Sequence, residues 1–117
     1  SPTRDLIDAG INLTSHSDCP VIPPNSLRII DATTNRVTRS GLILGPDQRT
    51  TPYEALLSQT RWGAYQYFEE GHKGTLTPGK LADFVVLNTD IMTAEPSKIL
   101  KTKVKATYLN GENVYTR

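Results

Sequence analysis

Residues 78–87 read Pro-Gly-Lys-Leu-Ala-Asp-Phe-Val-Val-Leu, and this stretch decides the fold class of the 117-residue chain. Its proline and glycine form a turn signal. The four apolar residues from Phe84 to Leu87 have the length of one β-strand. The period of the sequence changes here, from helical spacing before the turn to strand spacing after it.

The residues that follow predict two further strands. Residues 103–109 alternate between apolar and polar side chains. Asn110-Gly111 is a strong signal for a two-residue hairpin turn, and residues 112–116 return after it. The last third of the chain is therefore predicted to form a small, mainly antiparallel sheet.

The best-specified element upstream is a helix that begins after Thr51. Thr51 and Glu54 have the spacing of a capping box, and Pro52 takes the first helical position, where an N–H is not needed. Gly71 is predicted to end the helix. Six residues recur at helical spacing: Tyr53, Leu56, Leu57, Ala64, Tyr67 and Phe68. The aromatic set is predicted to lie mostly in the helix core: Tyr53, Trp62, Tyr65, Tyr67 and Phe68.

A short helix is predicted at the start of the chain. The Ser1 hydroxyl at the N-cap and Pro2 at the first helical position favour a helix start, and Gly10 favours a left-handed stop. Because the chain opens at Ser1 without a methionine and within an element, we expect it to be a piece of a longer protein.

A further helix is predicted after the prolines at positions 20, 23 and 24. Asn25 or Ser26 is the expected cap, and the apolar face begins with Leu27 and Ile30. Residues 36–48 contain two glycines, a proline and little periodicity, so they predict a loop.

Residues 11–18 alternate between an apolar and a polar face. Ile11 and Leu13 share one face, whereas His16 and Asp18 lie on the other. Such a strand suits the wall of a (β/α)8 barrel near its open mouth, where catalytic groups collect. Asp18 is therefore a candidate catalytic carboxylate, although a strand-end aspartate also commonly caps the following turn.

The composition argues against several classes of function. The formal net charge is +1, which argues against nucleic acid or an anionic membrane surface as an obligatory partner. The single cysteine, Cys19, excludes an internal disulfide and a structural zinc knuckle. No apolar run has the length of a transmembrane helix, and neither a phosphate-binding glycine loop nor a nucleophile elbow is present.

Two short motifs connect the chain to a known family. Residues 17–21 (Ser-Asp-Cys-Pro-Val) and residues 78–83 (Pro-Gly-Lys-Leu-Ala-Asp) resemble motifs at the C-terminal end of the amidohydrolase superfamily. The second motif is quite specific to the superfamily, and the first points to the branch that contains N-substituted formamide deformylases. The resemblance covers nearly the whole chain in order and spacing, with further matches at residues 45–49, 54–56, 73–76, 110–111 and 114–115.

The resemblance implies an α+β fold class. It consists of the last strand and helices of a (β/α)8 metallo-hydrolase barrel, followed by part of a composite β-sandwich that residues before and after the barrel build together. Residues 11–18 would then be the eighth barrel strand. Without its barrel neighbours in this chain, that strand is expected to be irregular or to pair with a non-native partner. Residues 1–72 would form the C-terminal end of the barrel, and residues 73–117 would form part of the sandwich.

The resemblance also implies a role for Asp18. It matches the strand-eight aspartate, which in the family binds the active-site metal and takes a proton from the attacking water, two tasks that suit a carboxylate. A divalent metal, most simply zinc, is therefore expected in the longer protein. The other family ligands match no residue here, and a catalytic zinc site usually needs about three protein ligands. We therefore expect this chain alone to leave Asp18 accessible, to bind no metal tightly and to catalyse nothing.

Other reactive or charged residues have simpler interpretations. His16 shares a face with Asp18 and would contact the substrate or a metal ligand, or have no role. Cys19 is expected to be a small buried residue rather than a nucleophile. Arg49 is expected to form a structural ion pair rather than line the site. His72 is expected to be a solvated cation near the negative end of the preceding helix. Lys80 and Asp83 are expected to have a structural role at the turn and strand start.

Three classes of function remain open. The resemblance favours a hydrolase of carbon–nitrogen bonds, whose partners would be a small amide-type substrate and the rest of its own chain. A regulatory or binding protein that kept the fold is the alternative, and a self-contained interaction module is the third. The deciding ligands, above all the His-x-His pair of the first barrel strand, match nothing in this sequence. Substrate, metal identity, localisation and a possible homo-oligomer are not determined by it.

Overall fold

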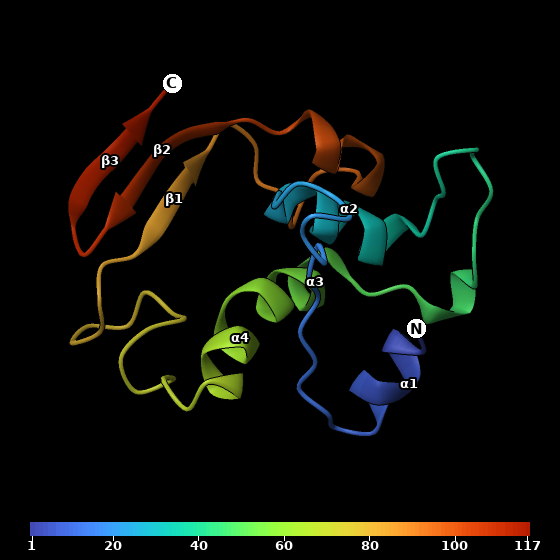
Figure 1. Cartoon of the computed structure of the whole chain (residues 1–117), viewed down its shortest axis with the longest axis horizontal. Coiled ribbons are helices and arrows are strands. Elements are labelled where there is room, and N and C mark those ends of the chain that lie inside the picture. Colours follow the sequence, from blue (N-terminus) through green and yellow to red (C-terminus); the bar gives the residue numbers. More distant parts are fainter.

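Residues 1–117 are all described by a computed structural model, in which helices gather at the centre and a sheet stands at one side (Figure 1). None of the helices is long and apolar enough to cross a membrane. In chain order the elements are α1 (Thr3–Asp8), α2 (Ser26–Asn35), η1 (Pro46–Gln48), α3 (Pro52–Gln59), α4 (Arg61–Gln66), β1 (Phe84–Leu87), η2 (Pro96–Lys101), β2 (Val104–Leu109) and β3 (Glu112–Thr116), where η marks a 3-10 helix.

The predicted antiparallel sheet is confirmed. Its strand order is β1-β2-β3, with Val85 opposite Thr107 and Thr107 opposite Tyr115. Asn110 and Gly111 join β2 to β3, and both have positive φ angles, of 49° and 79°. Two such residues in succession give the turn whose twist matches a hairpin, which is why Asn-Gly predicted it.

The Lys-Leu-Ala-Asp part of the motif holds this hairpin in place. The backbone N–H of Asn110 donates to Asp83 Oδ1 at 2.7 Å, and the N–H of Gly111 donates to the carbonyl of Ala82 at 2.8 Å. Lys80 Nζ donates to a backbone carbonyl of the preceding loop. The structural roles predicted for Lys80 and Asp83 are therefore confirmed.

Both faces of the sheet carry apolar side chains that the rest of the chain leaves largely uncovered. Phe84 stacks on Tyr108 with ring centroids 4.6 Å apart, while its neighbour Val85 faces the other side and is 53% exposed. Every residue of β3 is exposed, and Figure 1 shows the sheet at the side of the helical part. Exposed apolar side chains on a sheet are typical of a surface that takes part in further interactions.

Helix α3 begins as predicted. The Glu54 N–H donates to Thr51 Oγ1 at 3.1 Å, and the Thr51 N–H donates to Glu54 Oε2 at 2.8 Å, which completes the capping box. The prediction of one continuous helix up to Gly71 is wrong. The backbone breaks at Thr60, and beyond α4 the residue Phe68 is already left-handed, with φ of 58°.

The break has a local cause and a consequence for the aromatic residues. Thr60 Oγ1 donates to the Leu56 carbonyl at 2.8 Å, a back-bond that bends helices. Past the bend, the rest of the chain covers α4 only in part. The prediction that the aromatic residues pack mostly into the core is therefore wrong. Trp62 is partly buried, and the other aromatic residues of this set are exposed. The exposed aromatics are Tyr53, Tyr65, Tyr67 and Phe68.

The segment from Ile11 to Ser17 lies outside the sheet. It connects α1 to α2 without joining any strand ladder, which confirms the expectation that this segment is irregular in a chain without its barrel neighbours. A strand needs a neighbour to pair its N–H and C=O groups, and the only sheet forms elsewhere.

Gly10 has the predicted positive φ, of 79°, but Ser1 does not cap α1, because the N-cap is Pro2 and no side chain caps the helix.

A small core holds the helices together. Asn25 Oδ1 accepts the N–H of Arg28 at 3.1 Å, so α2 begins at the predicted cap. Helix α2 packs against α3 and η2, and residues 36–48 form the predicted loop, which contains one isolated bridge and η1. The core cluster is Ile30, Ala55, Ile91 and Ile99, against which Leu27, Leu56 and Leu87 pack.

An ion pair that the sequence did not predict joins α1 to α3. The two terminal nitrogens of Arg4 donate to the two carboxylate oxygens of Glu54 at 3.0 and 2.7 Å. The side chains are only 25% and 20% exposed. The hydrogen bond from Arg4 holds the pKa of Glu54 below its ordinary value. The Glu54 carboxylate therefore both caps α3 and pairs with Arg4, which lies 50 residues earlier in the sequence.

Changing Glu54 to Gln should remove part of the acid sensitivity of this chain. A carboxyl whose pKa is lower in the folded state stabilises the fold above its unfolded pKa of about 4.3. That stabilisation is lost as the pH falls through the folded pKa. Gln keeps the bond to the Thr51 N–H but loses the charge that pairs with Arg4. Near pH 7 the variant should melt a few degrees lower, and the gap should narrow as the pH falls below about 4.3 and through the lowered folded-state pKa.

Thermal unfolding followed by circular dichroism between pH 3 and pH 7 measures this effect. Glu112→Gln is the matched control, because Glu112 is an exposed carboxylate on β3 with no ion pair or side-chain hydrogen bond. If the Glu54→Gln curve runs parallel to the unchanged chain over the whole range, the pair does not contribute to the acid response.

Candidate functional site

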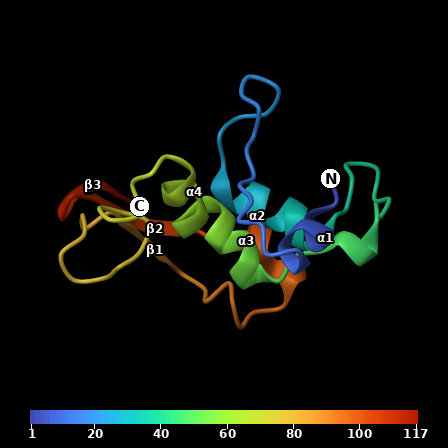
Figure 2. The same ribbon diagram turned by 90° about the horizontal axis from the view of Figure 1, so that it is seen from below.

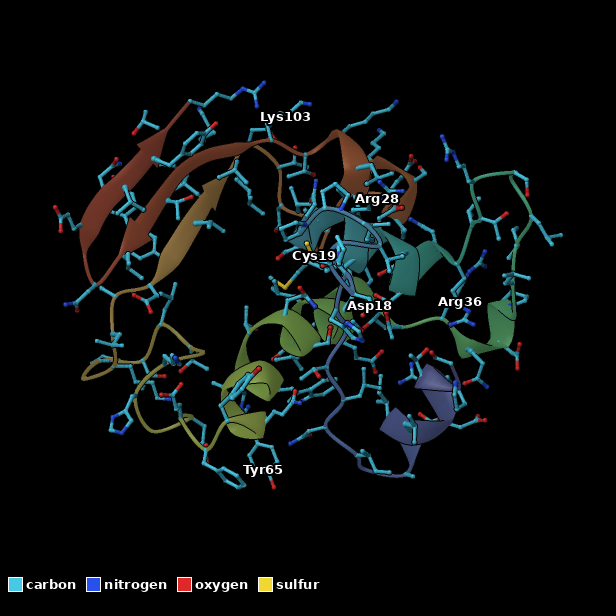
Figure 3. The ribbon with its side chains drawn as sticks, in the orientation of Figure 1. Asp18, Cys19, Arg28, Arg36, Tyr65 and Lys103 are labelled. Atoms are coloured by element: carbon cyan, nitrogen blue, oxygen red, sulfur yellow. The ribbon has the colours of Figure 1, made fainter.

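The segment between α1 and α2, which carries Asp18, stands out from the helices as a loop (Figure 2). Residues 18–21 form a turn in which the Val21 N–H donates to the Asp18 carbonyl at 2.8 Å. Asp18 has a φ of 52°, in the left-handed region that aspartate adopts more readily than most residues do. Figure 3 labels Asp18 and its neighbour Cys19 in this turn, and both are exposed.

His16 and Asp18 meet through the backbone. The N–H of Asp18 donates to His16 Nδ1 at 3.0 Å. A ring nitrogen that accepts a hydrogen bond carries no proton, so the neutral imidazole has its proton on Nε2. His16 thus offers an N–H donor, while its Nδ1 is already engaged.

The carboxylate of Asp18 has no partner in this chain. Neither of its oxygens accepts a hydrogen bond from a side chain or from the backbone, and no cation lies within ion-pair distance. The expectation that Asp18 is accessible in this chain is confirmed by its exposure. The alternative role, a cap of the following turn, is not performed by its side chain: the turn is closed by the backbone carbonyl of Asp18.

Two glutamines on the neighbouring helices hold the loop just before His16. Gln59 Nε2 on α3 donates to the carbonyl of Ser15, and Thr14 Oγ1 donates to Gln66 Oε1 on α4 at 2.6 Å. Sequence reasoning missed both contacts, because their partners lie 44 and 52 residues apart along the chain. A polar residue on a helix carries no signal of so distant a partner.

The residues present do not complete a metal site. No three side chains of His, Cys, Asp or Glu gather as metal ligands anywhere in the structure. Asp18 offers one free carboxylate, which is a suitable oxygen ligand for a divalent ion. Because Nδ1 of His16 is engaged by the Asp18 N–H, that nitrogen is not available as a second ligand in this arrangement. The chain therefore fits one ligand position of a divalent metal site and leaves the others unfilled.

Three residues singled out by the sequence are now placed. Cys19 is exposed, so its expected burial is wrong, because its turn projects away from the core. Arg49 forms no ion pair, and instead its Nε donates to the Asn35 carbonyl at the end of α2, 3.2 Å away. His72 is exposed, as predicted, although α4 ends at Gln66 and its dipole is no longer adjacent.

Comparison with known sequences identifies relatives along the whole chain. The model of a family described as "Amidohydrolase family" matches residues 1–115. The chain is 35% identical over 113 residues to Protein LONG AFTER FAR-RED 3 of Arabidopsis thaliana, a match that covers 96% of this chain and 19% of that protein. It is 29% identical over 116 residues to N-substituted formamide deformylase of Arthrobacter pascens, covering 99% of this chain and 21% of that enzyme.

Comparison with solved structures gives a matching fold. The crystal structure of an amidohydrolase from Thermotoga maritima MSB8 superposes with a TM-score of 0.68 and 24% sequence identity, over 98% of this chain and 26% of that one. A likeness at this identity shows a shared fold alone. The chain spans about a fifth of the length of the sequence relatives that it matches.

Proposed function

The chain belongs to the amidohydrolase family, and on that premise we propose that the complete polypeptide carrying it hydrolyses carbon–nitrogen bonds of the amide or formamide type. The observation that carries the proposal is the match of residues 1–115 to the family, with the unpaired Asp18 carboxylate in the motif of residues 17–21. The name of one relative, N-substituted formamide deformylase, supports the bond type.

In this proposal Asp18 is the general base. Its carboxylate has no competing hydrogen bond, so both oxygens are free to orient a water molecule and accept its proton. The same carboxyl can then return the proton to the leaving nitrogen. His16, whose Nε2–H is free to donate, would contact the substrate, while its Nδ1 fixes the backbone of Asp18.

A divalent metal, most simply zinc, would supply Lewis-acid polarisation of the substrate carbonyl. Asp18 would hold it as one ligand among several, since this chain contributes a single free carboxylate at the site. We propose that the remaining ligands lie in parts of the complete polypeptide outside these 117 residues.

We also propose the place of this chain in the larger fold. Residues 1–72 would form the end of the (β/α)8 barrel, and residues 73–117 would form part of a composite β-sandwich. The uncovered apolar faces of the β1-β2-β3 sheet support the second assignment, because a sandwich needs another layer over such a face. In the barrel, residues 11–17 would gain the strand neighbours that they lack here.

The experiment is a hydrolysis assay of the complete polypeptide on a panel of N-formyl and N-acyl amines, with and without added zinc. We expect turnover that a chelator abolishes and zinc restores. Lack of activity on every carbon–nitrogen substrate with metal supplied would remove the proposal. The alternative, a regulatory or binding protein that keeps the amidohydrolase fold, would then replace it. One observation favours that alternative: the relative at 35% identity carries a name that states no reaction.

The 117-residue chain alone should bind zinc only weakly. A single carboxylate contributes little affinity without further ligands, so calorimetric titration should show no site tighter than the micromolar range. The Asp18→Asn chain should give the same weak isotherm. A tight one-to-one site would show that further ligands assemble in this chain, and His16→Ala would be the first variant to test.

A further inference from the structure

A hollow of about 1200 Å³ lies beside α2, and the charged residues that line it are mostly positive. Four arginines line it, and Asp31 is the only acidic residue among the lining residues. The chain as a whole carries a net charge of only +1, so positive charge is concentrated here. The four residues are Arg28, Arg36, Arg39 and Arg49.

None of these four arginines is neutralised by an acid. The ion pairs of the structure involve only Arg4, Lys73 and Lys98 as the cations. The acid on the wall, Asp31, already accepts a hydrogen bond from Asn35 Nδ2 at 2.8 Å. Arg36 is partly buried and the other three are exposed, so their positive charges act together on an anion that enters the concave surface from solvent.

Backbone carbonyls fix the orientation of two of the guanidinium groups. Arg36 Nε donates to the Leu44 carbonyl at 2.6 Å, and Arg49 Nε donates to the Asn35 carbonyl at 3.2 Å. With Nε engaged, each group keeps its two terminal nitrogens for a further partner. Guanidinium groups held in this way lose little freedom on binding a planar or tetrahedral oxyanion.

The arginines are spread along the wall rather than stacked at one point. Figure 3 shows Arg28 and Arg36 near the two ends of α2, and eight residues of helix correspond to about 12 Å. The negative end of the α2 dipole accounts for cations at Arg36 and Arg49. It does not account for Arg28 in the first turn or for Arg39 in the loop beyond the helix.

We propose that this hollow is a binding site for a small anion with at least two negative charges, of the carboxylate or phosphate class. The inference rests on the arginine lining and does not depend on the proposed hydrolysis. His16 lies on the same hollow, so a bound anion would sit close to the loop that carries Asp18.

The test uses the 117-residue chain and two probes, inorganic phosphate and succinate, with sodium chloride at matched ionic strength as the reference. Binding is followed by nitrogen–proton NMR spectra that include the arginine Nε–H signals. At an ionic strength of about 0.01 M, where charges are little screened, we expect saturable one-site binding with a dissociation constant on the order of 1 mM. The tighter of the two probes identifies the oxyanion class.

Two variants and a matched control decide the location. Arg28→Gln and Arg39→Gln should each weaken binding about fivefold, because neither side chain bonds to the protein and the fold should not change. Arg61→Gln removes an arginine of α4 that also lacks an acid partner but lies outside the hollow, and it should leave the affinity unchanged. Shifts that follow ionic strength alone, or an equal loss in the Arg61 variant, would overturn the proposal.

Discussion

Changing Asp18 to Asn in the complete polypeptide should lower kcat/KM for amide or formamide hydrolysis by about 10²–10⁴-fold. Asn keeps the shape of the side chain and one oxygen, but it cannot take a proton from the attacking water. The fold should be unaffected, because Asp18 is exposed and its carboxylate has no partner in this chain. Asn also tolerates the left-handed backbone, here with φ of 52°, as readily as aspartate does.

Asp83→Asn is the matched control for this experiment, since it makes the same chemical change at the other aspartate of the family motifs. Asp83 Oδ1 accepts the N–H of Asn110 at the hairpin turn, so the loss of charge should weaken the fold by about 1 kcal/mol. Activity per folded molecule should stay near normal. Turnover and thermal unfolding, measured for both variants, separate the two roles. Full activity of the Asp18 variant would remove the catalytic assignment.

Changing Ile99 to Ala should have the largest effect on stability. Ile99 is the most buried large side chain, at 1% exposed, and it packs from η2 into the cluster with Ile30, Ala55 and Ile91. Truncation of a buried isoleucine costs about 2–5 kcal/mol, through lost burial and the cavity that remains. Because only six apolar residues are buried, the chain has little stability in reserve, and we expect extensive unfolding at room temperature.

Leu100→Ala is the control next to Ile99. Leu100 lies on the same short helix but is 54% exposed, so its truncation should change stability by about 0.5 kcal/mol or less. Urea unfolding of the 117-residue chain, followed by circular dichroism, measures both variants. Equal destabilisation by the two changes would mean that η2 does not anchor the core as the structure has it.

The elements that the sequence predicted correctly are those whose causes are local. Asn110-Gly111 predicts its turn because both residues must adopt positive φ, and Thr51 with Glu54 predicts a helix start because the two side chains bond within one turn. The structural roles of Lys80 and Asp83 were predicted from the motif of residues 78–83, and the family was predicted from short motifs in the right order along the chain.

The rest of the fold depends on partners that the local sequence does not show. Residues 11–17 have the alternation of a strand, but alternation describes a side-chain pattern and does not provide a neighbouring ladder. The helical spacing after Thr60 predicted a buried aromatic face, yet burial requires another element to cover it, and most of those rings stay exposed. Cys19 was predicted to be buried but is exposed, for the same reason.

For the candidate site, short sequence motifs identified the family and singled out Asp18 and His16. The three-dimensional structure was needed to show that the His16 ring bonds to the backbone of Asp18, that Gln59 and Gln66 hold the loop, and that Arg4 pairs with Glu54. It alone also placed four arginines around one hollow. Local hydrogen bonds and turn angles are set by residues a few positions apart, whereas these contacts depend on how distant segments pack, which no local pattern contains.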